Sequence, residues 1–134
     1  MIRFQSLGGS SAPTAVPVII TAAGSDVSTP LTAGSGKAYM PHPNAYNLLN
    51  VGFFLVTPQT SGTTFTVDIF KNGVSILSTK ITITNGDQFS WDAITQPVIS
   101  DPSISPTDEV RSEIIAIGDG TAKGIIIMLI GEEV

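Results

Sequence analysis

His42 is the only histidine of the chain, and it lies between Pro41 and Pro43 in a segment rich in Gly, Ser, Thr and Pro. A Ser–His–Asp triad or a histidine-based zinc site needs histidine at its centre. The sequence has no second histidine to complete a metal pair, and neither HExxH nor GxSxG is present. We therefore expect His42 to be an exposed loop residue or part of a subunit contact, and we predict no catalytic residue.

The carboxylates are scattered along the chain rather than paired by a motif. Asp87, Asp101, Asp108 and Asp119 each lie among turn-forming residues, where an Asp side chain usually accepts hydrogen bonds from nearby backbone. Calcium between Asp101 and Asp108, or between Asp87 and Asp92, stays open as an alternative. Glycoside hydrolysis needs two acids at a set separation, and no such pair is evident. We predict no metal, no cofactor and no enzymatic activity.

The composition limits the kinds of partner. Of 134 residues, 13% are charged, with 6 Lys+Arg against 11 Asp+Glu and a formal net charge of -5. An acidic chain without a basic run has no general attraction to nucleic acid or to anionic membranes. The absence of cysteine excludes disulfides and thiol chemistry. So few charges indicate that another subunit covers part of the surface.

The elements that would position these residues are predicted to be strands. Residues 63–70 alternate apolar and polar side chains, with Phe65, Val67 and Ile69 on one face, which is typical of a half-buried strand. Asn72-Gly73 joins this run to the next and indicates a type I′ hairpin. The expected strands cover residues 17–22, 38–40, 47–57, 63–70, 74–84, 89–94, 96–99, 109–117 and 123–130. No stretch has helical periodicity, so the fold class is predicted as an antiparallel β-sandwich.

Two of these strands are apolar on both faces. They span residues 51–56 and 125–130, whereas a strand of a two-layer sandwich needs only one apolar face. One interpretation is that a loop or the N-terminal segment buries the second face. The favoured interpretation is a symmetric subunit contact. Its expected residues are Val51, Phe53, Ile126, Met128 and Ile130.

The chain divides into an extended N-terminal arm, residues 1–16, and a β-domain, residues 17–134. The arm has no periodicity but carries Ile2, Phe4 and Leu7 as apolar anchors and Arg3 as a charged one. It either folds back on its own domain or docks on another protein. A second candidate surface consists of aromatic residues that could stack on a sugar, Tyr39, Tyr46 and Trp91. The alternative for Trp91 is a place in the core.

Residues 66–83 (TVDIFKNGVSILSTKITI) resemble a β-sandwich module of tailed-bacteriophage structural proteins. The resemblance extends over residues 45–131 and includes Pro97–Asp101, Thr107–Glu109 and the glycine-flanked run Gly124–Gly131. It implies a jelly roll that assembles as a homotrimer. It also implies a place on the virion, after synthesis in the host cytoplasm, and carries over no enzymatic residue.

Such modules occur in capsid decoration (cement) proteins, head fibres and tail-fibre tips. The sequence shows no long fibre shaft before the module, which favours decoration of the mature capsid. The expected partners are two further copies of the chain and the major capsid protein, which the arm would contact. The alternative is a receptor-binding module at a head-fibre or tail-fibre tip. There Tyr39, Tyr46 and Trp91 would meet a host surface glycan or protein.

Overall fold

The structure is a computed structural model that describes residues 16–34 and 38–134. Within these residues the fold is all-β with antiparallel pairing, as predicted, and no described residue is α-helical. The strands are β1 (Pro17–Ala23), β2 (Tyr46–Thr57), β3 (Phe65–Lys71), β4 (Val74–Ser75), β5 (Leu77–Thr79), β6 (Ile81–Ile83), β7 (Val98–Ile99), β8 (Ser103–Ile104), β9 (Val110–Ala116) and β10 (Lys123–Glu133). A 3-10 helix, η1 (Ser90–Asp92), precedes β7.

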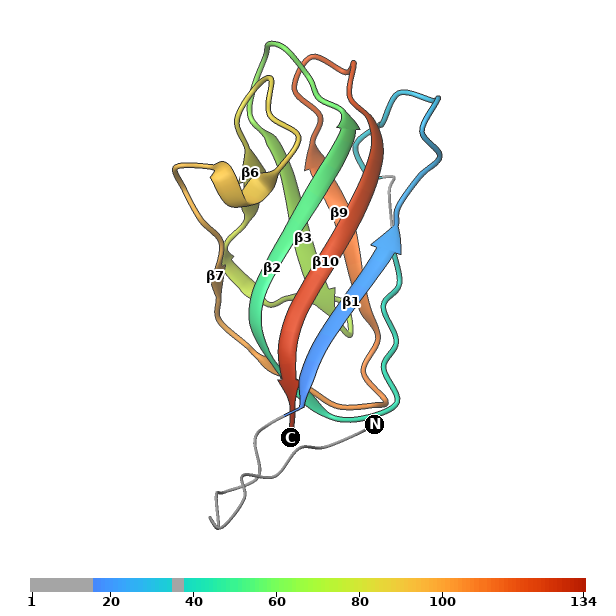
Figure 1. Ribbon diagram of the computed structural model, residues 1–134, viewed down its shortest axis with the longest axis vertical. Coiled ribbons are helices and arrows are strands. Elements are labelled where there is room, and N and C mark those ends of the chain that lie inside the picture. The colour runs from blue at the N-terminus through green and yellow to red at the C-terminus, as the bar shows by residue number, and fades with distance from the viewer. Residues whose placement is uncertain (1–15, 35–37) are drawn as a thin grey trace, which may run out of the picture.

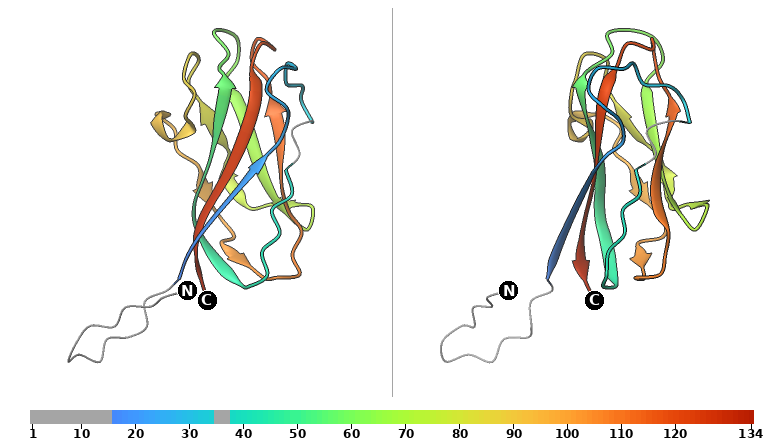
Figure 2. Two further views of the ribbon diagram at one scale, coloured as in Figure 1. Left: turned by 45° about the vertical axis from the view of Figure 1, so that its right-hand side comes forward. Right: turned by 90° about the vertical axis from the view of Figure 1, so that its right-hand side faces the viewer.

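Two sheets face each other (Figures 1 and 2). One has the order β1-β10-β2-β8, so that the last long strand of the chain is central in it. The other is built on β3, which pairs with β4 and β6 along one edge and with β9 along the other. A short pair, β5 with β7, stands apart from both sheets.

The core fills the space between the two sheets. The first contributes Phe53, Leu55 and Ile127, and the second contributes Phe65 and Ile81, all fully buried. The rings of Phe53 and Phe65 meet across the layers with 5.6 Å between their centroids. Burial of apolar surface contributes about 25 cal/mol per Å² to the free energy of folding. This interior is therefore the main source of stability.

The Asn72-Gly73 hairpin is confirmed. Lys71 pairs with Val74 across it, and both turn residues have positive φ, 52° for Asn72 and 81° for Gly73. Asn72 also ties the hairpin to the chain before β9. Its Nδ2 donates to Asp108 Oδ1 over 2.8 Å, and its Oδ1 accepts from the Glu109 N–H over 2.8 Å.

The expected strand at residues 38–40 is present in a minimal form. Tyr39 forms a bridge with Arg111, the Met40 N–H donates to Val110 O, and the Ser112 N–H donates to Ala38 O. The chain therefore pairs with the free edge of β9 at this point. Ala38 and Met40 point into the core.

Three predicted elements were wrong. The run 74–84 is not one strand, because β5 turns away from β3 to pair with β7. The run 89–94 is not a strand but contains η1, since the Ala93 N–H closes a turn on Ser90 O. The connection 100–107 contains β8, which pairs with the start of β2.

Candidate functional site

The side of the first sheet that points away from the core is a continuous surface of uncharged, mostly apolar residues. The strand register aligns three rows across β1, β10 and β2. From these rows we define the outer apolar face by nine residues: Ile19, Ile130 and Asn50, then Thr21, Met128 and Gly52, then Ala23, Ile126 and Phe54. None of the nine carries a charge.

Strand alternation explains why this surface exists. Along β10 the residues Ile125, Ile127 and Leu129 are buried in the core, so the intervening Ile126 and Met128 must point outward. A solvated outer face normally carries polar side chains. Here both sets are apolar, and Ile126 keeps 39% of its surface exposed.

An aromatic cluster continues the outer apolar face beyond β2. The ring of Phe54 lies 5.1 Å from that of Phe89, centroid to centroid, and Phe89 lies 4.8 Å from Trp91. A bridge from Phe54 to Phe89 and a hydrogen bond from the Phe53 N–H to Ser90 Oγ (2.9 Å) hold η1 against β2. Phe89 and Trp91 are 37% and 46% exposed.

The outer side of the second sheet differs in character. Arg111 on β9 bonds Glu109 and Glu113, with its Nη atoms 2.9 Å and 3.1 Å from their carboxylate oxygens. These two carboxylates raise the pKa of the Arg111 guanidinium, which also lies 5.1 Å from the centroid of the Phe70 ring. Nearby Lys80 pairs with Asp68 (3.8 Å). The outer side of the second sheet therefore carries charged side chains, unlike the outer apolar face.

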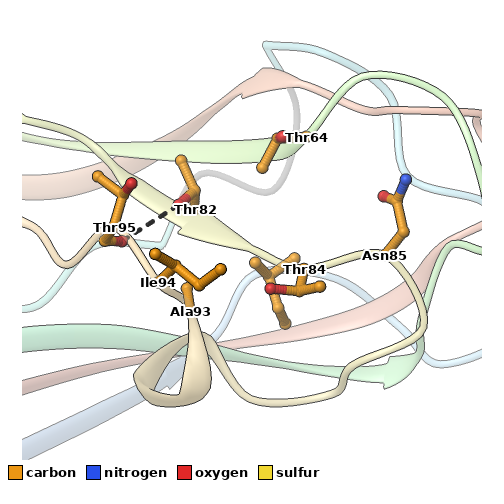
Figure 3. A pocket seen from close by; sticks show the side chains of 8 residues that line it. Thr64, Thr82, Thr84, Asn85, Ala93, Ile94 and Thr95 are labelled. Atoms are coloured by element: carbon orange, nitrogen blue, oxygen red, sulfur yellow. Dashed lines mark hydrogen bonds between the residues drawn. The ribbon is translucent and has the colours of Figure 1, made fainter.

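A shallow groove of about 310 Å³ lies beside β6 (Figure 3). Its side chains are mostly threonines and small apolar residues: Thr64, Thr82, Ile83, Thr84, Asn85, Ala93, Ile94 and Thr95. Thr82 Oγ1 bonds Thr95 O across the groove over 3.4 Å. The lining carries no charged side chain.

The structure sorts the predicted interface residues into two groups. Ile126, Met128 and Ile130 lie together on the outer apolar face. Val51 and Phe53 do not, because both point into the core, where they are 4% and 0% exposed. These two residues are corrected to core positions.

The predicted aromatic surface is not one surface. Tyr46 is 1% exposed, so it belongs to the core and meets no ligand. Tyr39 is exposed, but it pairs with β9 of the second sheet. Trp91 is half-exposed and belongs to the first sheet's aromatic cluster rather than to the core. Ile2, Arg3, Phe4 and Leu7 of the arm lie outside the described residues.

Sequence reasoning missed Ile19 and Phe54 as parts of the outer apolar face, and Phe89 as part of the aromatic cluster beside it. Ile19 is 68% exposed and pairs with Ile130. The consecutive pair Phe53-Phe54 was an available signal, because one of two adjacent strand residues must point outward. No local signal places Phe89 beside Phe54, since their bridge joins segments 35 residues apart.

Two of the four carboxylates considered for calcium, Asp101 and Asp108, already have partners. Asp101 pairs with Lys71 (2.5 Å), and Asp108 accepts from Asn72 Nδ2 and from the Ser105 N–H. These hydrogen bonds lower the pKa of Asp108. In residues 16–34 and 38–134 no group of three or more His, Asp or Glu side chains is placed to hold a metal ion. His42 lies near the C-terminal strand, with Nε2 3.7 Å from Glu133 Oε1.

Asp119 fastens two loops at one end of the molecule. Its Oδ2 accepts from the N–H and hydroxyl groups of Thr60 and Ser61, and its Oδ1 accepts from those of Thr121. These bonds favour the carboxylate and hold the pKa of Asp119 well below its usual range. The β2–β3 loop is thereby tied to the β9–β10 loop.

Comparison of the sequence with protein-family models gives no match, and comparison with the curated proteins gives none either. Among the described residues, no helix is long and apolar enough to span a membrane.

Proposed function

We propose that the protein is a structural subunit of a tailed-bacteriophage virion, a homotrimeric decoration (cement) protein that binds the mature capsid and stabilises it. The resemblance of residues 45–131 to phage modules supports the virion role. The observation that carries the proposal is the outer apolar face, an uncharged sheet surface whose Ile19 and Ile126 stay exposed in the single chain, with the exposed Trp91 beside it. Such a patch is typical of a chain that works inside an assembly.

The strand order supports the jelly-roll part of the proposal. In chain order, β1, the segment at Tyr39, β2, β3, β6, the segment at Phe89, β9 and β10 form eight positions. When the isolated bridges at Tyr39 and Phe89 are counted as strand positions and the short strands β4, β5, β7 and β8 are left out, the first sheet follows the order 1-8-3-6 and the second the order 2-7-4-5. An order of this kind suits the two Greek keys of the proposed jelly roll.

In this proposal, capsid stabilisation follows from linkage and multivalency. A ligand that binds only the mature lattice stabilises that lattice. A trimer that touches several major-capsid subunits at once gains avidity of about 10²–10⁴ without any strong single contact. The arm, with Ile2, Arg3, Phe4 and Leu7, is the proposed capsid-binding segment. Nothing in this role needs a cofactor, a membrane or nucleic acid.

The proposal is tested by locating the protein on purified virions with a gold-labelled antibody in electron microscopy. Label over the capsid shell is expected, together with capsids that break at lower temperature when the protein is absent. Deletion of residues 1–12 is expected to leave a folded trimer that no longer binds capsids. Label confined to the tail, or no label on any particle, contradicts the decoration role.

The alternative role is receptor binding at a head-fibre or tail-fibre tip. The threonine groove beside β6 favours it, because uncharged hydroxyl and methyl groups suit a neutral host glycan. Substitution of Thr84 or Thr95 by Val would then reduce adsorption to host cells. Tyr39→Ala, at the opposite edge of the same sheet, tests whether this exposed aromatic residue also contacts the receptor. Unchanged adsorption by the folded variants removes this alternative.

A further inference from the structure

We infer that the occupant of the outer apolar face is a second copy of this chain. The inference rests on the proposed function for its context, because it assigns the subunit contact of that assembly to a defined surface. Neither the groove beside β6 nor the hydrogen-bonded loops around Asp119 offers a comparable surface for a second copy. The first is small and the second has all its acceptor oxygens engaged.

Charge is the first argument for a homotypic contact. Each copy carries a net charge of -5, so two copies repel unless their contact avoids like charges. The outer apolar face has no charged residue among its nine positions. The opposite side of the fold presents Arg111, Glu109, Glu113 and Lys80. A contact through that side would have to desolvate these ion pairs.

Composition is the second argument. Permanent subunit interfaces are richer in apolar residues than transient ones, and aromatic residues and Met are enriched at their centres. The outer apolar face places Met128 and Ile126 on the central strand, with Phe54, Phe89 and Trp91 beside them. A contact of this kind suits copies that assemble once and stay together.

Continuity is the third argument. The nine positions come from three neighbouring strands in continuous register from Ile19–Asn50 to Ala23–Phe54. At Gly52 the missing side chain lets η1 approach closely, since a Cβ there would lie 3.0 Å from Ser90 Oγ. Trp91 of η1 therefore borders the face on which a neighbouring copy would pack.

The test compares two isoleucines of nearly equal exposure on opposite sheets. Ile126 on β10 is 39% exposed, and Ile115 on β9 is 44% exposed. In sedimentation equilibrium of the full chain, the wild type is expected to be an oligomer. Ile126→Glu is expected to raise the subunit dissociation constant at least 100-fold, and Ile115→Glu is expected to change it less than threefold.

A second variant protects the test against misfolding. Thr21 lies in the row of Met128 and is exposed, so Thr21→Arg adds a charge to the face without touching the core. It is also expected to give a folded monomer, as judged by circular dichroism. Trp91 is the only tryptophan, and its emission should shift to longer wavelength when either variant dissociates.

The outcomes separate this inference from the proposed function. A wild-type chain that is monomeric at 100 µM overturns the inference, as does an oligomer that survives both substitutions. An oligomer that both substitutions dissociate supports the inference. If virions nevertheless carry no antibody label, that second result overturns the decoration role but not the subunit contact. If the wild-type chain forms a dimer through this face, the result supports the inferred contact and contradicts the proposed homotrimer.

Discussion

Ser90 packs closely against Gly52, because position 52 has no side chain to meet the Ser90 hydroxyl. A Cβ at position 52 would be 3.0 Å from Ser90 Oγ and 3.5 Å from Trp91 Cε3. The same Ser90 hydroxyl accepts the Phe53 N–H inside the fold. A strand residue of the outer apolar face thus determines how close η1 comes to the sheet.

Gly52→Val is expected to push η1 away and to break the bond between the Phe53 N–H and Ser90 Oγ. Loss of a buried hydrogen bond costs about 1–3 kcal/mol of unfolding free energy. Urea unfolding followed by Trp91 emission measures it. Thr21→Val is the control, because Thr21 lies exposed in the same row and should change stability by less than about 0.5 kcal/mol. Equal stability of Gly52→Val and wild type would refute the packing argument.

Tyr46→Phe is expected to leave stability unchanged or to raise it by up to about 1 kcal/mol. The Tyr46 hydroxyl is buried and finds no hydrogen-bond partner among the described residues, so the substitution removes only an unpaired polar atom. Tyr46→Ala should cost about 3–5 kcal/mol as the ring is lost. Chemical unfolding at pH 7 distinguishes the two. A loss above about 1 kcal/mol in Tyr46→Phe would reveal a bond to this hydroxyl.

Tyr46 also predicts a loss of stability in alkali. Burial and the charge of Asp108 raise the pKa of its phenol from 10.0 to about 12. Above pH 10 the unfolded chain releases this proton while the native state keeps it, so stability falls between pH 10 and pH 12. Tyr46→Phe should lack this part of the decline. The measurement is unfolding free energy against pH for both proteins, and parallel curves would contradict the assignment.

Asp119→Asn is expected to lower the melting temperature at neutral pH, because an amide cannot accept all the hydrogen bonds from Thr60, Ser61 and Thr121. The lowered pKa of Asp119 means that its contribution is present above pH 3.8 and is lost as the pH falls below it. The wild type should therefore lose more stability on acidification than the variant. Asp92→Asn, at an exposed residue of η1, is the control. Identical acid profiles for wild type and Asp119→Asn would disprove this role of Asp119.

Gly73→Ala is expected to destabilise the fold by about 1–2 kcal/mol. Gly73 has a φ of 81°, which costs other L-residues energy, and a Cβ there meets no atom within 4 Å. The penalty is therefore purely conformational. Gly73→Asn should recover part of it, since Asn adopts this region more readily. Thermal unfolding of the wild type, Gly73→Ala and Gly73→Asn measures these differences in stability. A Gly73→Ala variant as stable as the wild type would argue against a turn with positive φ at position 73.

The sequence predicts the features that depend on neighbours in the chain. The Asn72-Gly73 hairpin and the alternation of Phe65, Val67 and Ile69 are local, and both appear as expected. The division of residues 74–84 depends on the Ser100 N–H, which donates to Ile76 O, and on the β5–β7 pair. Those partners are distant in sequence, so no local pattern predicts that residues 74–84 divide into separate strands.

The orientation of β2 could not be predicted for a similar reason. Tyr46 and Leu48 point inward, and so do Val51, Phe53 and Leu55, which have the opposite parity. The change occurs at Leu49, where the register with β10 shifts between Ile130 and Gly131. This irregularity places Tyr46 inside and assigns Val51 and Phe53 to the core. Because nearly all residues of this run are apolar, their types do not show which alternate set points into the core.

The central position of β10 has a consequence for how the protein is made. β10 follows β1 and β2 in the chain, yet both depend on it as their neighbour. The first sheet therefore cannot close until β10 has been synthesised. Closing it joins residues of β1 and β10 that are more than a hundred positions apart, a topology that slows folding. Removal of β10 would leave β1 without a partner.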